Sequence, residues 1–151
     1  MGSDLIIPFC PDEYAHRNGL YWPRMVTILH TLAVSGCAVR AEMAIDLSAR
    51  FACHIGSPVI KFPFYYLAAD GLVYSTLAPL ISSSRITLAR LTEKGADLCR
   101  TWWNIEPLES DWTRLERLRS PNLGYIALTL QAAFHARLRG WKVIVAPEGK
   151  N

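Results

Sequence analysis

The sequence has few charged residues and no long uninterrupted apolar segment. Asp, Glu, Lys and Arg make up 19% of its 151 residues and hydrophobic residues 51%, which excludes the polar composition of disordered chains. The longest charge-free stretch, 120–136, is interrupted by Pro, Asn, Gly, Gln and His, so we predict no transmembrane helix. The N-terminus has neither a basic segment ahead of an apolar run nor a myristoylation signal, and we expect a cytoplasmic protein without membrane contact.

Cysteine is sparse and scattered. Cys10, Cys37, Cys53 and Cys99 lie far apart, each among apolar residues. The C-x-x-C pairs of zinc sites and the cysteine density of a disulfide scaffold are both missing from the sequence. We therefore predict reduced, buried thiols and no metal site.

The sequence also lacks the motifs that bind phosphates or activate a nucleophile. It contains no glycine-rich phosphate loop, no nucleophile elbow and no cluster of metal ligands. Cys53 and His54 are adjacent, but on a helix their side chains would point about 100° apart. We predict no enzymatic activity, no catalytic residue and no cofactor.

A modest, uneven excess of positive charge is present. The net charge is +3; residues 1–80 hold five bases and six acids, whereas residues 81–151 hold eleven bases and seven acids. A mildly basic C-terminal half permits contact with nucleic acid. A mean hydropathy of +0.15 in so small a chain also indicates that some apolar surface meets a partner, because small domains have much surface for their volume.

Apolar spacing and helix-stop residues predict three helices in the first half of the chain. A loop-like segment rich in Pro, Asn and Gly precedes them, and we assign residues 1–22 to an N-terminal arm. The helices are expected over 23–36, over 39 to about 54, and over 57 to about 70. Pro63 is expected to bend or delay the third helix.

A hairpin and a fourth helix follow. Strands are predicted over 72–77 and 85–91, on either side of a turn-like segment 79–84. The next helix is expected to run from Thr92, whose side chain can cap it, to about Ile105. Residues 23–106 therefore predict an α+β, mainly helical domain.

Residues 107–151 are predicted to be a C-terminal extension for dimerisation or docking. We expect a short helix over 110–119 capped by Ser110, a longer helix over 120–140, and a terminal strand over 141–146. The main apolar stripe of the longer helix comprises Leu123, Ile126, Leu130 and Phe134. Further apolar surface comes from Leu128 and Ala132. A helix that is apolar on more than one side has to be covered on more than one side, which favours a homodimer.

Two motifs in the middle of the chain resemble a known superfamily. The first is Tyr65-Tyr66-Leu67-Ala68-Ala69-Asp70-Gly71-Leu72-Val73, ahead of the hairpin, and the second is Leu91-Thr92-Glu93-Lys94-Gly95. At this spacing they resemble the winged helix-turn-helix domains of MarR-like and PadR-like bacterial regulators, over roughly residues 23–104. In that superfamily a recognition helix ends in Leu-x-x-x-Gly-Leu-Val, the wing follows, and Leu-Thr-x-x-Gly starts the next helix.

The resemblance implies a homodimeric bacterial or phage transcription regulator that binds double-stranded DNA. Helix 57–70 would be the recognition helix and residues 80–86 the wing. Polar and basic side chains on these elements, together with an arginine near the start of the second helix, are able to contact base edges and phosphates. The predicted DNA-binding residues are Arg40, Ser57, Lys61, Tyr65, Ser83, Ser84 and Arg85.

Two other hypotheses remain open. Phe62, Pro63 and Phe64 suit a hydrophobic partner or the core better than base edges, which favours a non-enzymatic protein-interaction winged-helix subunit of a nucleic-acid-processing or defence complex. Exposed aromatics over 62–66 would indicate a protein partner of this third helix, and buried ones would leave its other face for DNA. A piece of a nuclease-like protein is the third hypothesis, because Glu148 follows the predicted terminal strand.

Overall fold

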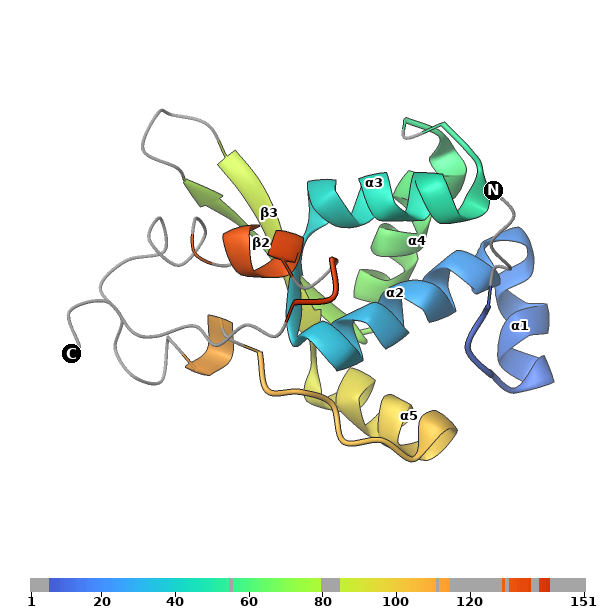
Figure 1. Ribbon diagram of the computed structural model, residues 1–151. Helices are drawn as coiled ribbons and strands as arrows, with labels where there is room; N and C mark the ends of the chain where they lie inside the picture. The colour runs from blue at the N-terminus through green and yellow to red at the C-terminus, as the bar shows by residue number, and fades with distance from the viewer. Residues whose placement is uncertain are drawn as a thin grey trace.

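The computed structural model in Figure 1 describes residues 6–54, 56–79, 85–110, 112–114, 129, 131–136 and 139–141. The elements in chain order are α1 (Asp12–Asn18), the 3₁₀ helix η1 (Gly19–Tyr21), α2 (Trp22–Ser35), β1 (Cys37–Val39), α3 (Arg40–Phe51), α4 (Pro58–Ala69), β2 (Val73–Pro79), β3 (Arg85–Leu91) and α5 (Glu93–Trp103). The fold is α+β and mainly helical with a small antiparallel sheet, which confirms the predicted class.

Helix α2 forms the centre of the core. Its fully buried residues include Met25, Ile28, Leu29 and Leu32, which recur at helical spacing. The helix packs against α1, α4, α5 and the strands, and Figure 1 shows α5 on the opposite side of α2 from α3 and α4. Gly36 ends α2 as predicted, with φ +85° and its N–H donating to the Leu32 carbonyl oxygen at 2.8 Å.

The sheet has the strand order β1-β3-β2, and both pairs are antiparallel. Val73 of β2 pairs with Leu91 of β3 at one end of the hairpin, and Pro79 pairs with Arg85 at the other. The predicted hairpin is therefore present. It projects from the helices at one side of the molecule (Figure 1).

Strand β1 is a difference from the sequence prediction, which placed the start of a helix at Val39 and no strand before it. Cys37, Ala38 and Val39 are all buried and pair with Arg90, Ala89 and Leu88 of β3. A three-residue strand that is buried on both sides shows no alternation of polar and apolar residues. Helix α3 consequently begins at Arg40.

The predicted loop-like start also contains structure. Helix α1 follows Pro11, carries two acids in its first turn and ends at Gly19, which has φ +52°. Its Tyr14 is only 6% exposed and belongs to the same core as α2. Helix α1 is therefore packed on the core through Tyr14.

Three helix boundaries test the predictions further. Helix α3 ends at Phe51, earlier than predicted, because Ala52 adopts the left-handed conformation with φ +52°. Helix α4 begins at Pro58 as predicted and continues past Pro63. Helix α5 begins after Thr92, whose hydroxyl oxygen accepts the Gly95 N–H at 3.0 Å, which confirms the predicted cap.

Two aromatic residues of the described part of 107–151 pack on the same core. Trp112 and Phe134 are each 1% exposed within the hydrophobic cluster. Ser110 caps the turn at residues 112–114 as predicted, because its hydroxyl oxygen accepts the Thr113 N–H at 3.4 Å. Residues 129 and 131–136 are helical, and Ala132 is exposed. The other predicted apolar residues of this helix, together with residues 142–146 of the predicted strand, lie outside the described residues.

All four cysteines are described, and each is a thiol without a disulfide bond. Cys10, Cys37 and Cys99 are buried as predicted. Cys53 is only half-buried, because it follows the end of α3.

Candidate nucleic-acid interface

Helix α4 has one face in the core and one in solvent. Ile60, Phe64 and Leu67 are buried at i, i+4 and i+7, and they pack against α2 and β2. The opposite face exposes Lys61 and Tyr65, two of the predicted site residues. Half-buried Ser57 immediately precedes the helix, and its carbonyl oxygen accepts the N–H groups of Ile60 at 2.9 Å and Lys61 at 3.2 Å.

The C-terminal end of α4 is fixed by Gly71, which has φ +74°. The Gly71 N–H donates to the Ala68 carbonyl oxygen and the Leu72 N–H to the Leu67 carbonyl oxygen, both at 3.0 Å. This pair of bonds is the Schellman arrangement, in which a glycine takes the left-handed conformation without steric cost. Gly71 therefore ends α4 and sets the angle at which β2 leaves it.

The aromatic segment at residues 62–66 is divided between core and solvent. Pro63 and Phe64 are buried, whereas Phe62 is 37%, Tyr65 49% and Tyr66 41% exposed. Exposed aromatic rings over 62–66 are predicted to indicate a protein partner. The exposure of Phe62, Tyr65 and Tyr66 therefore favours the protein-interaction hypothesis.

The exposed rings of α4 join Tyr21 of η1 in one surface cluster, which we call the aromatic patch. It consists of Tyr21, Phe62, Tyr65 and Tyr66. The Tyr21 ring centroid lies 5.2 Å from that of Tyr66 and 6.2 Å from that of Phe62. Phe62 lies 6.3 Å from Tyr66 and 6.4 Å from Tyr65, so the four rings form a continuous set.

Arg40 lies at one end of the aromatic patch. It is the first residue of α3, and its guanidinium carbon lies 4.9 Å from the Phe64 ring centroid and 5.1 Å from the Tyr65 ring centroid. Cation–π attraction at these distances holds the charge beside Tyr65 while leaving the side chain partly exposed. The structure thus brings together the predicted site residues Arg40 and Tyr65 from two different helices.

Of the predicted DNA-binding residues of the hairpin, the structure describes only Arg85. Arg85 is the first residue of β3 and pairs with Pro79. Ser83 and Ser84 lie outside the described residues.

The region that contains α4 and the hairpin is poor in acids. Between residues 47 and 92 the sequence holds one acid, Asp70, and four bases: Arg50, Lys61, Arg85 and Arg90. Arg50 pairs with Asp46 at 2.9 Å, just before this range. Arg90 lies over the Trp112 ring at 4.1 Å and the Tyr74 ring at 5.3 Å. With Arg50 paired to Asp46, the other three bases exceed Asp70 by two, so this stretch of the sequence is mildly positive.

Tyr21 was not among the predicted site residues, because the sequence placed it in an N-terminal arm. The available signal was local. Gly19 with Pro23 marks a turn into a helix, and a large side chain within such a turn has to lie either on the core or on the surface. Tyr21 is half-buried and contacts both the core and the rings of Phe62 and Tyr66.

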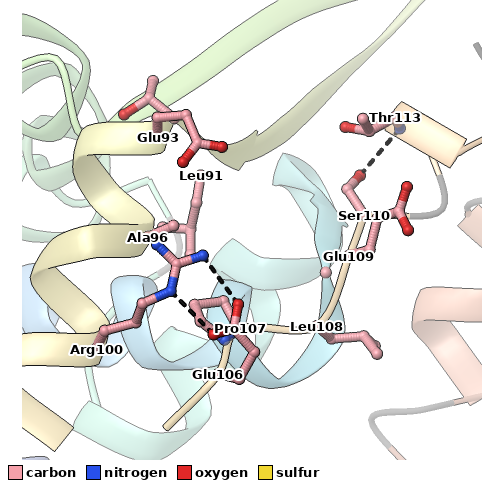
Figure 2. A pocket seen from close by; sticks show the side chains of 12 residues that line it. Leu91, Glu93, Ala96, Arg100, Glu106, Pro107, Leu108, Glu109, Ser110 and Thr113 are labelled. Atoms are coloured by element: carbon pink, nitrogen blue, oxygen red, sulfur yellow. Dashed lines mark hydrogen bonds and ion pairs between the residues drawn. The ribbon is translucent and has the colours of Figure 1, made fainter. Parts of the chain in front are cut away.

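A separate cleft of about 240 Å³ lies between α5 and residues 106–110, and Figure 2 shows its lining. Arg100 donates to both carboxylate oxygens of Glu106, at 3.0 and 2.9 Å, and to Asp97 at 2.6 Å. The hydrogen bonds from Arg100 lower the pKa of the Glu106 carboxyl. Because these charges satisfy one another on the surface, we assign no ligand to this cleft.

Among the residues that the structure describes, no group of three or more His, Cys, Asp or Glu side chains is placed to hold a metal ion. None of the helices in the described ranges is long and apolar enough to cross a membrane.

Comparison with known proteins gave no relative: no protein-family model, no curated protein and no solved structure matches this chain.

Proposed function

We propose that this chain is a winged-helix DNA-binding protein and a transcriptional regulator. In this proposal α4 enters the major groove and the β2–β3 hairpin is the wing. The order of elements supports it: helices α2, α3 and α4, then the hairpin, then α5 are the order that the resemblance to MarR-like and PadR-like regulators implies. Gly71 and Thr92 support it as well, because each makes the turn or cap that its motif requires.

The observation that carries the proposal is the solvent face of α4. Lys61 and Tyr65 lie on this face, one turn apart, and Arg40 of α3 lies beside Tyr65. A lysine and an arginine neutralise phosphates, and a tyrosine hydroxyl donates to phosphates or base edges. Ser57 at the start of α4, together with Ser83, Ser84 and Arg85 at the wing, completes the proposed contact set.

The proposal includes a homodimer. Regulators of this kind bind two half-sites about 34 Å apart, one turn of the double helix, and a two-fold symmetric protein matches that spacing. The exposed Ala132 of the C-terminal helix supports a contact there, because it adds apolar surface away from the buried Phe134.

Charge reversal at the proposed interface tests DNA binding. Lys61→Glu with Arg85→Glu should abolish binding of a labelled random duplex at low salt. In the wild type, each phosphate neutralised contributes about −0.9 to the slope of log K against log salt, so binding should weaken steeply as salt is added. Fluorescence anisotropy over a salt series measures both effects.

A matched control makes the same change in net charge elsewhere. Arg17→Glu with Arg139→Glu reverses two exposed bases that lie outside α4 and the hairpin, and this variant should retain duplex binding. Equal loss of binding in both double variants would show that net charge alone matters. Equal retention in both would remove Lys61 and Arg85 from the interface.

A second candidate function is a protein-interaction subunit, which the exposed Phe62 and Tyr66 favour. Large exposed aromatics are enriched at the centres of protein interfaces. This candidate predicts that the wild type binds no duplex at any salt concentration. The same titration therefore separates the two functions.

A further inference from the structure

We infer that the aromatic patch binds the bases of single-stranded nucleic acid. The inference rests on the proposed function, because it requires a nucleic-acid ligand, and it extends that function to a second form of the ligand. The bases would stack on Phe62, Tyr66 and Tyr21, and Arg40 and Lys61 would hold the neighbouring phosphates.

The spacing of the rings suits a strand rather than one flat ligand. Crossing the patch from α3 to η1, the guanidinium of Arg40 is followed by the rings of Tyr65, Phe62 and then Tyr66 with Tyr21. Successive centroids are 6.4, 6.3 and 5.2 Å apart. Proteins that bind single strands combine a cationic edge with aromatic rings on which successive bases stack.

Charge argues for a nucleic acid as the occupant. Helix α4 contains no acid in any of its twelve positions, and the sequence from 47 to 92 contains only Asp70. Arg40 and Lys61 both lie next to exposed rings, which gives the patch a positive border. A polyanion that carries flat π-faces matches both properties at once.

The two modes of binding share Arg40 and Lys61 as phosphate contacts but differ in the aromatic residues of α4 that they use. Lys61 and Tyr65 belong to the proposed duplex interface, whereas Phe62 and Tyr66 lie toward η1, in contact with Tyr21. Phenylalanine has no group that hydrogen-bonds to a base edge. Loss of the Phe62 and Tyr66 rings should therefore affect single-strand binding and spare duplex binding.

The experiment compares oligo(dT) with a random duplex of equal length at low salt. Phe62→Leu with Tyr66→Leu keeps the apolar character and removes the rings, and it should weaken oligo(dT) binding about tenfold or more. Duplex affinity should change less than about twofold. Phe62→Tyr with Tyr66→Phe keeps both rings and should bind both probes like the wild type. Phe9→Ala removes an exposed ring outside the patch and is the control.

A stacking signal distinguishes direct contact from a structural effect. An oligo(dT) that carries one 2-aminopurine should lose fluorescence on binding the wild type and the ring-retaining variant, because stacking quenches this base. Equal oligo(dT) affinity in the wild type and the double leucine variant would overturn the inference. If the wild type binds the duplex but not oligo(dT), the inference is also overturned, and the proposed function stands. Failure of the wild type to bind either probe would contradict both the inference and the proposed function.

Discussion

The side-chain hydroxyl of Thr92 donates a 2.6 Å hydrogen bond to the main-chain carbonyl oxygen of Gly71. The Thr92 hydroxyl oxygen also accepts the Gly95 N–H, so one side chain caps α5 and ties it to the turn that ends α4. The Thr92 N–H donates to the Leu72 carbonyl oxygen at 3.1 Å and adds a main-chain link. The two sequence motifs therefore meet in space, and they fix the direction of α4 relative to the sheet.

Replacement of Thr92 tests this link. Thr92→Val keeps the shape of the side chain but removes both hydrogen bonds, and it should lower the free energy of unfolding by about 1–2 kcal/mol. In a chain of this size that corresponds to roughly 2–8 °C in Tm. Thr92→Ser keeps the hydroxyl and should lose much less. Thermal unfolding measures the difference, and equal Tm values for the valine and serine variants would contradict the role of the hydroxyl.

Gly95 is expected to tolerate no side chain. A Cβ at this position would overlap with the Leu72 carbonyl oxygen and would touch the Leu91 side chain at 3.2 Å. Gly95→Ala should therefore destabilise the protein by about 2 kcal/mol or more, because main-chain atoms must shift. Gly56→Ala is the control, since its nearest neighbour is the His54 side chain at 3.4 Å. Urea denaturation that ranks the two alanine variants equally would refute this explanation.

The residues at the ends of the helices show why the middle of the fold could be predicted from the sequence. Gly36, Gly71 and Thr92 are stop and start residues whose conformations depend on a few neighbours, so a local pattern was enough to place α2, α4 and α5. The hairpin was predictable for a similar reason, because the turn between its strands is marked by Pro79 and a run of serines.

The elements that the sequence did not reveal depend on distant contacts. Strand β1 exists because residues 37–39 pair with β3, about fifty positions later, and three buried residues carry no periodic signal of their own. The aromatic patch depends on Tyr21 meeting Phe62 and Tyr66, which requires η1 and α4 to pack together. Exposure of Phe62 beside buried Phe64 likewise depends on which face of α4 meets α2.

Tyr14 provides a test of burial. Burial, and to a lesser degree the charge of Asp70, raise the pKa of the Tyr14 phenol well above its usual value. Because the folded pKa exceeds the unfolded value of about 10, the stability contributed by the protonated phenol is present below pH 10 and is lost above it. Tyr14→Phe should therefore reduce the loss of Tm between pH 7 and pH 11.

The same variant should not be destabilised at pH 7. Among the described residues the buried hydroxyl of Tyr14 has no hydrogen-bond partner, so its removal should leave the free energy of unfolding unchanged or raise it by up to about 1 kcal/mol. Tyr74→Phe, which changes an exposed tyrosine, serves as the control at both pH values. A drop of several degrees at pH 7 in Tyr14→Phe would show that the hydroxyl makes a stabilising contact.

The cysteines should differ in their reactivity. Burial raises the pKa of the Cys99 thiol to about 11, so little thiolate is present at pH 8, whereas Cys53 is only half-buried. Iodoacetamide at pH 8 should modify Cys53 first and Cys99 only after unfolding in urea. Peptide mass spectrometry over a time course follows both sites, and equal rates in the native protein would contradict the burial of Cys99.

The native mass of the purified protein, with and without a random DNA duplex at low salt, tests the central proposal most directly. If the chain is a dimeric winged-helix DNA-binding protein, the spectrum should show a complex of two chains with one duplex, which disappears as the salt concentration rises. A spectrum in which the duplex never associates with the protein, at any ratio of the two, would contradict DNA binding.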